Sequence, residues 1–212
     1  MARARKPASM PVSSGNPCPF LRALVAEGLL DDGVEPLSKV ASTVARVARA
    51  GEGGPSLPPA AIWAIALIAH GLTPLTLART AREGLRLSGL RDGPLDKHGA
   101  GSGILDPRGR VVERELARLD EFASEQIGTS GQSERGLTLP QIRRYMDTNF
   151  ERAEGRRRAL DRKLMDGEWP VLLKVMGRDG SGGRYLSVAD VRTLVIDRAL
   201  PKRMTQALAA AA

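Results

Sequence analysis

Apolar residues recur every three or four positions through most of this chain, and no segment alternates apolar and polar residues as a half-buried strand would. Such spacing places the apolar side chains on one face of an α-helix. On this pattern we expect helices over 19–30, 37–50, 60–72, 74–85, 111–127, 138–153, 168–175 and 188–199. The sequence therefore predicts an all-α fold, a single domain of about eight helices around one core.

Length and composition predict how the chain is organised. With 212 residues and 42% hydrophobic residues, it is long enough to bury one substantial core. We expect a flexible basic N-terminus over 1–14, a helical domain over 15–204 and a loose, Ala-rich tail over 205–212. The segment 177–190 has the look of a calcium-binding loop but lacks its first ligand, so we interpret it as a turn.

The most apolar window of the chain covers residues 60–72, AAIWAIALIAHGL. It is too short to span a bilayer, so we interpret it as a buried helix and expect no membrane partner. The basic residues near the N-terminus are not followed by an apolar stretch, which argues against a secretory signal. A single cysteine fits a reducing compartment, and we therefore expect a cytoplasmic protein.

That single cysteine, Cys18, lies between two prolines at the start of the first expected helix. Pro19 suits the first helical position, where its missing N–H costs nothing. The positive end of the helix favours a thiolate, which can act as a nucleophile, a redox sensor or a metal ligand. The alternative is that Cys18 is a buried, inert, small hydrophobic residue.

Cysteine and histidine counts restrict the metal chemistry. One cysteine and two histidines cannot form a disulfide framework or a zinc site of three or four Cys and His ligands. A heme iron needs only one ligand from the protein.

The net charge of +8 raises the question of a nucleic-acid partner. The basic run 152–163 is interrupted by acidic residues, and the chain contains no recognised nucleic-acid motif. We interpret the run as a solvated helix face and expect no nucleic-acid partner.

Three segments resemble the heme-thiolate peroxidases, the family of chloroperoxidase and the unspecific peroxygenases. Residues 16–30, NPCPFLRALVAEGLL, are similar to the family's opening Pro-Cys-Pro and the helix after it. Residues 95–99, LDKHG, are similar to its Leu-x-Lys-His-Asn stretch. Residues 185–192, followed by Leu200 and Pro201, are similar to its closing helix. The matches come in the family's order and span nearly the whole chain.

The resemblance implies an all-helical fold around a heme pocket, with heme b bound and Cys18 as the proximal ligand of the iron. It also implies that hydrogen peroxide is used to oxidise or oxygenate small organic substrates. A thiolate ligand donates electron density to iron and favours O–O cleavage. Phe20 and Leu21, beside the cysteine, are the candidates to pack under the porphyrin.

The chain departs from the family on the other side of the implied heme. The family's Glu-His-Asp, which holds magnesium near a propionate, is replaced by residues 100–106, AGSGILD. Asp106 is the one carboxylate there, whereas Mg²⁺ prefers several oxygen ligands. We therefore expect no magnesium site, and we consider Arg108 or Arg110 as direct partners of a propionate.

Peroxide cleavage needs a group that takes a proton from one oxygen and gives it to the other. The family uses a glutamate in the second half of the chain, and Glu154 is our first candidate and Glu151 our second. The alternative is that both are solvated partners of the neighbouring arginines. His98 is a third candidate, and its alternative is to fix the loop in which it lies.

The sequence thus favours a heme-thiolate peroxidase or peroxygenase, an enzyme that acts on a small-molecule substrate with hydrogen peroxide. A second hypothesis is a heme-binding or redox-sensing protein without turnover, because the Glu-His-Asp is missing. A third is a thiol enzyme that uses Cys18 and His98, for which the sequence carries no family signature. The sequence does not indicate an oligomeric state.

Overall fold

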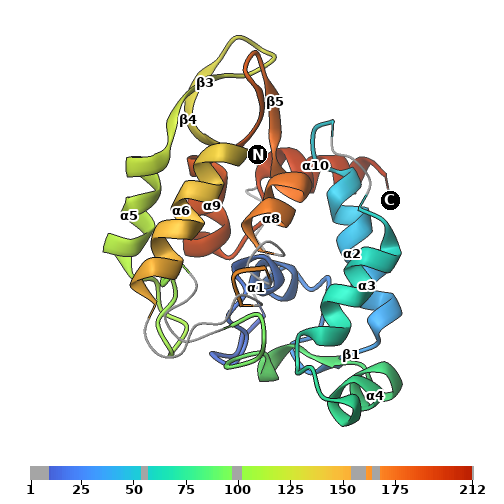
Figure 1. The fold of residues 1–212 in the computed structure, drawn as a ribbon. Helices are drawn as coiled ribbons and strands as arrows, with labels where there is room; N and C mark the ends of the chain where they lie inside the picture. Colours follow the sequence, from blue (N-terminus) through green and yellow to red (C-terminus); the bar gives the residue numbers. More distant parts are fainter. Residues whose placement is uncertain (1–9, 54–56, 97–101, 154–160, 164–167, 212) are drawn as a thin grey trace.

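The structure is a computed structural model that describes residues 10–53, 57–96, 102–153, 161–163 and 168–211 (Figure 1). The first half of the chain contains α1 (Pro19–Ala26), β1 (Val34–Glu35), α2 (Leu37–Arg49), α3 (Pro59–Ile68), α4 (Pro74–Glu83), β2 (Leu85–Arg86) and the short 3₁₀ turn η1 (Leu87–Gly89). The second half contains α5 (Glu113–Phe122), β3 (Ser124–Ile127), β4 (Ser133–Thr138), α6 (Leu139–Arg152), α8 (Trp169–Met176), β5 (Arg178–Gly180), β6 (Gly183–Ser187), α9 (Val188–Arg192), the π-helical turn η2 (Thr193–Asp197) and α10 (Lys202–Ala210).

The expectation of an all-α fold is wrong, because the chain forms two antiparallel sheets as well as its helices. Strands β1 and β2 make a two-stranded sheet, and the other four strands pair in the order β3-β4-β6-β5. In the larger sheet Leu137 lies opposite Leu186, and Glu125 lies opposite Arg135. The fold is therefore mixed, with helices grouped around one end of a small sheet.

The four-stranded sheet curls so that its two outer strands meet, as the ring of ribbon at the top of Figure 1 shows. A bridge joins Gly128 to Gly180, and Ser181 N–H donates to the carbonyl of Ile127 at 3.0 Å. The ring of Tyr185 fills the inside of the curl. A Cβ at Gly136 would lie 2.4 Å from this ring, and one at Gly180 would lie 2.9 Å from it. Glycine is therefore required on both strands that flank Tyr185.

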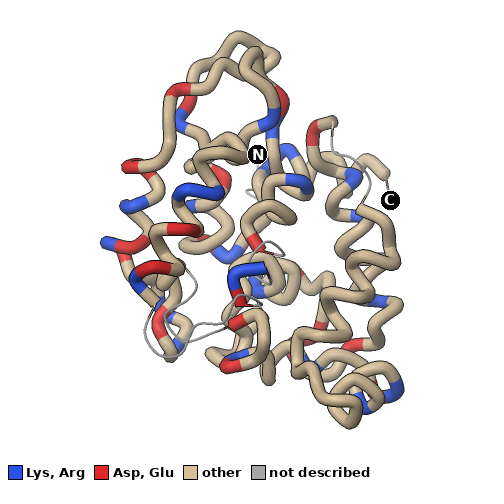
Figure 2. The backbone as a smooth tube through the Cα atoms, in the orientation of Figure 1, with Lys and Arg blue, Asp and Glu red and all other residues tan. Residues whose placement is uncertain are grey.

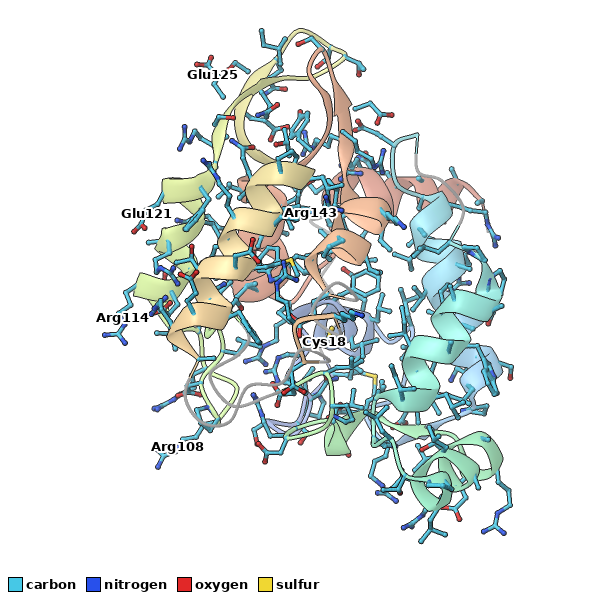
Figure 3. The ribbon with its side chains drawn as sticks, in the orientation of Figure 1. Cys18, Arg108, Arg114, Glu121, Glu125 and Arg143 are labelled. Atoms are coloured by element: carbon cyan, nitrogen blue, oxygen red, sulfur yellow. The ribbon has the colours of Figure 1, made fainter. Side chains whose placement is uncertain are left out.

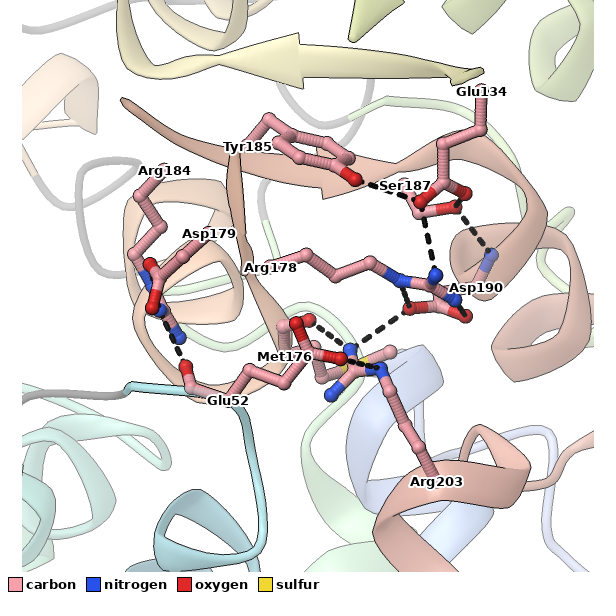
Figure 4. Close-up of polar contacts among 10 residues, drawn as sticks. All are labelled: Glu52, Glu134, Met176, Arg178, Asp179, Arg184, Tyr185, Ser187, Asp190 and Arg203. Atoms are coloured by element: carbon pink, nitrogen blue, oxygen red, sulfur yellow. Dashed lines mark hydrogen bonds and ion pairs between the residues drawn. The ribbon is translucent and has the colours of Figure 1, made fainter. Parts of the chain in front are cut away.

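A network of charged side chains fixes this sheet to the helices beside it (Figure 4). Arg178 on β5 makes a two-pronged ion pair with Asp190 on α9, with contacts of 3.0 and 2.9 Å, and a second pair with Glu134 on β4 at 2.9 Å. Arg203 on α10 donates to the same Asp190 carboxylate at 2.9 Å and to the carbonyl of Met176. The network joins two strands and three helices around one carboxylate.

Helix α1 lies at the centre of the molecule, between α2 and α3 on one side and α5, α6 and α9 on the other (Figure 1). Ala23, Leu24 and Val25 are fully buried, which makes α1 the middle of the hydrophobic core. Its first residue is Pro19, as the sequence predicts, and Cys18 occupies the N-cap position. The core therefore holds the segment that carries the cysteine.

Several other helices begin where the sequence predicts. Helix α6 starts after Thr138, whose backbone N–H donates to the side-chain oxygen of Gln141 at 2.8 Å. Ser187 caps α9, at the start of the helix expected over 188–199, by accepting from the N–H of Asp190. Helix α10 continues to Ala210 with Leu208 packed against the core, so much of the segment expected to be a loose tail is helical.

The most apolar segment is not buried as expected. Only Ile62 and Ala66 of α3 are buried, and α3 packs on α2 at the edge of the molecule. His70, just after α3, accepts or donates at both ring nitrogens: Nε2 is 2.9 Å from the Arg86 carbonyl and Nδ1 is 3.3 Å from the Thr80 hydroxyl. A carbonyl only accepts, so Nε2 carries the proton and Thr80 donates to Nδ1. His70 thus fixes α3 and α4 to β2.

None of the helices in the described part of the chain is both long and apolar enough to cross a membrane.

Candidate functional site

Cys18 is half-buried at the start of α1, near the middle of the molecule (Figure 3). The backbone N–H groups of Leu21 and Phe20 lower the pKa of its thiol, although neither forms a full capping hydrogen bond. Burial has the larger effect and raises the pKa above its ordinary value. The expected thiolate is therefore not the resting form at neutral pH, because loss of solvent outweighs the helix N-terminus.

The loop that leads to Cys18 is held by Arg22, a buried arginine one turn along α1. Its guanidinium donates to the carbonyls of Ser13 at 2.8 Å, Asn16 at 3.0 Å and Gly109 at 3.3 Å. Asn16 is itself fully buried, and its side chain donates to Asp32. These contacts hold the loop before Cys18 against Arg22, Asp32 and Gly109.

Glu168 is a second titratable group within electrostatic reach of Cys18. It occupies the N-cap position of α8, with Pro170 in the first turn, as Pro19 follows Cys18 in α1. Burial, and to a smaller extent the negative charge of Asp96, raises the pKa of its carboxyl group to about 8. At neutral pH the carboxyl group is thus close to its midpoint and can both give and take a proton.

Asp96 acts electrostatically on both Cys18 and Glu168, and we call these three groups the site cluster. The charges of Glu168 and Asp96 both raise the pKa of the Cys18 thiol. Arg91 lies 3.5 Å from the Asp96 carboxylate and also donates to the carbonyl of Ser14 at 3.0 Å. Arg91 thereby links Asp96 to the loop that precedes Cys18.

Three aromatic rings pack edge to face beside the start of α8. Trp169, the residue after Glu168, contacts the buried Tyr145 edge to face at 5.1 Å between ring centroids. Tyr145 contacts Phe122 in the same way at 5.3 Å. These rings give α8 a rigid, apolar support at its N-terminal end, where the Glu168 carboxyl group is deprived of water.

The other residues proposed from the sequence lie apart from the site cluster or outside the described residues. Glu154 and His98 fall outside them, so both remain predictions. Glu151 is exposed on α6. Phe20 and Leu21 are partly buried and pack against the hydrophobic core.

The arginines considered as partners of a propionate are engaged or directed elsewhere. Arg110 forms an ion pair with Asp106 at 2.8 Å. Figure 3 shows Arg108 pointing outward, away from Cys18. Asp106 also accepts from the backbone N–H groups of Arg108 and Arg110, both at 2.8 Å, so its carboxylate closes its own loop.

Sequence reasoning located Cys18 but missed Asp96 and Glu168. A signal for Glu168 was present, because an ionisable residue at a helix start, followed by proline within two positions, occurs at both Cys18 and Glu168. Nothing in the sequence indicated that Glu168 would lose its water, since this depends on how the start of α8 packs against other parts of the chain.

Among the residues that the structure describes, no three His, Cys, Asp or Glu side chains come together in a way that would hold a metal ion. Cys18 can supply one sulfur ligand, and a cofactor that brings its other ligands requires no more from the protein. Comparisons with protein-family models, with curated proteins and with solved structures find no match to this chain.

Proposed function

We propose that this chain is a heme-thiolate protein that uses hydrogen peroxide to oxidise or oxygenate small organic molecules. In this proposal Cys18 is the proximal ligand of a heme b iron. The observation that carries the proposal is the site cluster, in which a cysteine at the start of α1 lies within electrostatic reach of a carboxyl group whose pKa is about 8. The resemblance of residues 16–30 to the heme-thiolate peroxidases supports it.

Cys18 would hold the heme iron through its sulfur, the one protein ligand that the cofactor needs. A bound iron cation would favour the deprotonated sulfur and so oppose the effect of burial on the pKa of Cys18. The backbone N–H groups of Phe20 and Leu21 then stabilise the anionic sulfur. Arg22, through its three carbonyl contacts, keeps the sulfur in place.

When heme is bound, its iron supplies the redox chemistry that activates hydrogen peroxide. The protein has to move one proton between the two peroxide oxygens. We assign this task to the Glu168 carboxyl group, which lies at the start of α8 within electrostatic reach of Cys18 and whose pKa is raised by burial to about 8 in the heme-free chain. Glu151 is less suited because it is exposed, while Glu154 stays a prediction.

A second candidate function is a heme-binding or redox-sensing protein without turnover. The contacts of Asp106 favour this function. Asp106 is the one carboxylate in the stretch that replaces the family's Glu-His-Asp, and it accepts hydrogen bonds from Arg108 and Arg110 in its own loop. The thiol-enzyme hypothesis is the least favoured, because a thiol whose pKa is raised by burial is a poor nucleophile at neutral pH.

Heme binding is tested by adding hemin to the purified protein and recording spectra of the reduced form with carbon monoxide. The proposal expects stoichiometric uptake and the red-shifted Soret band typical of thiolate ligation. Cys18→Ala should lose that band, whereas Ser42→Ala, at an exposed position on α2, should keep it. Absence of uptake, or an unchanged band in Cys18→Ala, would overturn the proposal.

Turnover of a simple phenol with hydrogen peroxide then separates the enzyme from the sensor. The enzyme should lose activity in Glu168→Gln while its heme spectrum stays that of the parent protein. A heme-loaded protein with no peroxide-dependent turnover supports the second candidate.

A further inference from the structure

The most hydrophobic helix of the chain lies at the surface with its outer side uncovered. Helix α3 consists entirely of proline, alanine, isoleucine, leucine and tryptophan, yet only Ile62 and Ala66 are buried. Trp63 is 39% exposed, and Ala60, Ala61 and Ala64 are exposed around it. A helix that is apolar on all sides is normally buried, so the uncovered side of α3 calls for a partner.

The turn after α3 and the start of α4 extend this apolar surface. Leu72 in the turn is 40% exposed, and Leu75 in the first turn of α4 is 78% exposed. Thr80 is the one buried residue of α4, which projects from the lower right corner of the molecule (Figure 1). We call Trp63, Leu72 and Leu75 the apolar tip.

Basic residues follow the apolar tip on the same helix. Arg79 and Arg82 on α4 are strongly exposed, with 71% and 81% of their side chains accessible, and share one partner, Glu83, at 2.9 Å each. Arg86 follows on β2, so the three arginines keep a positive excess over this single carboxylate. Between residues 57 and 86 the sequence contains three arginines and a single acidic residue, Glu83. At 100° per residue, Leu75, Arg79 and Arg82 share the outer side of α4. Figure 2 shows basic positions at this corner of the backbone.

We propose that the apolar tip and the arginines behind it bind the surface of an anionic lipid bilayer. The apolar side chains enter the boundary between headgroups and acyl chains, and the arginines contact the acidic headgroups. Tryptophan favours that boundary because its ring is apolar and its N–H is polar. The protein lies on the membrane and does not span it.

Charge and shape favour a bilayer over a second copy of this chain. A symmetric dimer through this surface would bring the same arginines of both copies together, and like charges repel. Leu75 stands at a protruding helix start, whereas a stable protein interface needs a broad complementary patch. A fluid bilayer accepts a protruding apolar residue without a matching pocket.

Hydrogen bonds hold the segment that carries the apolar tip in place. His70 ties α3 and α4 to the Arg86 carbonyl, and Thr73 caps α4 by accepting from Thr76 N–H at 3.2 Å. Since neither Leu72 nor Leu75 belongs to the hydrophobic core, both can be replaced without unfolding the protein. The proposal is independent of whether the chain binds heme.

Vesicle binding by the full chain tests the proposal directly. We expect sedimentation with vesicles of phosphatidylcholine mixed with phosphatidylglycerol, little binding to phosphatidylcholine alone, and weaker binding as salt is added. The emission of Trp63 should shift to the blue on binding, while Trp169 is already buried. Trp63→Phe should abolish the shift.

Two pairs of variants separate specific binding from general attraction. Leu72→Ser with Leu75→Ser should lower the partition coefficient at least about tenfold, because two leucines no longer leave water. The matched control, Ile127→Ser with Ile196→Ser, changes two other exposed apolar residues and should bind as the parent does.

Charge is tested in the same way. Arg79→Gln with Arg82→Gln should also lower the partition coefficient about tenfold or more, since each arginine near an acidic surface contributes on the order of 1 kcal/mol. Arg114→Gln with Arg143→Gln removes the same charge from exposed positions on α5 and α6 and should have a much smaller effect.

The proposal is overturned if neither kind of vesicle binds the protein, or if both variants and controls bind equally. It is also overturned if the protein self-associates in sedimentation equilibrium, Leu75→Ser abolishes the association and vesicles fail to bind, because the surface then joins two copies of the chain.

Discussion

At the scale of single residues, Cys18 is governed by two opposing effects. The helix start lowers the pKa of its thiol, whereas burial and the charges of Glu168 and Asp96 raise it. Burial is the largest of these influences, so the free protein holds a protonated thiol at neutral pH. A protonated thiol is a weak nucleophile, and it can bind a metal cation only when its proton is lost.

This balance predicts slow chemistry at Cys18 in the heme-free protein. Alkylation by iodoacetamide at neutral pH should run more slowly than for a free cysteine, because only the thiolate reacts and burial raises the pKa of the Cys18 thiol. Glu168→Gln should speed the reaction at alkaline pH, since it removes a charge that raises the pKa of the thiol. Mass spectrometry of timed samples gives the rates. A Cys18 that reacts as fast as free cysteine would contradict the assigned burial.

Glu168 makes the stability of the fold depend on pH. Its carboxyl group has a pKa of about 8 in the folded protein, above the ordinary value of 4.5, so the folded state holds the proton more tightly than the unfolded chain. The stabilisation is complete below pH 4.5 and is lost as pH rises through 8. The free energy of unfolding should therefore fall by a few kcal/mol, at most about 5, across this interval.

Urea unfolding at a series of pH values measures this slope. Glu168→Gln should flatten it and should be more stable than the parent protein above pH 8, because no charge has to be buried. Glu121→Gln, at an exposed position on α5, should leave the slope as it is (Figure 3). Equal slopes in the parent and in Glu168→Gln would show that Glu168 is solvated.

At the scale of elements, the sequence predicts the helices well and the strands poorly. Apolar spacing located α1, α2 and α6, and α1 begins at Pro19 as expected. Strands β3 and β5 read SEQI and RDG, with no apolar alternation to indicate them. They are strands because their backbones pair with β4 and β6, and because Tyr185 and the charged network fill the space between them. The local sequence of a short strand does not reveal such partners.

The glycines around Tyr185 give the clearest prediction for the sheet. Gly136→Ala would place a Cβ 2.4 Å from the Tyr185 ring, which is fully enclosed and cannot move aside. We expect a loss of about 1–3 kcal/mol in the free energy of unfolding, measured by thermal and urea denaturation. Gly182→Ala is the matched control, because the nearest atom to its Cβ is 3.9 Å away. A similar effect of both changes would mean that Tyr185 does not occupy the curl of the sheet.

At the scale of the whole molecule, the sheet and the C-terminal helix are joined through one carboxylate. Asp190 receives Arg178 from β5 and Arg203 from α10, while Arg178 also reaches Glu134. The pKa of Arg178 is raised by these partners, Asp190 first, so the arginine stays charged at any pH that the fold survives. Attachment of the sheet to the helical body thus depends on a side chain to which the sequence analysis gave no role beyond its place at the start of the helix expected over 188–199.

Replacing Asp190 should therefore loosen parts of the protein that are far apart in sequence. Asp190→Asn keeps the volume but leaves two largely buried arginines without their main counter-charge, and we expect a loss of about 3–5 kcal/mol. Asp120→Asn breaks the ion pair between Asp120 and Arg192. Both side chains are more than a third exposed, so the free energy of unfolding should fall by less than about 1 kcal/mol. Hydrogen exchange distinguishes a local from a shared effect: in Asp190→Asn, amides of β5 and α10 should both exchange faster. If only α9 were affected, the carboxylate would be a local feature of that helix and the sheet would be held by Tyr185 and its backbone pairing alone.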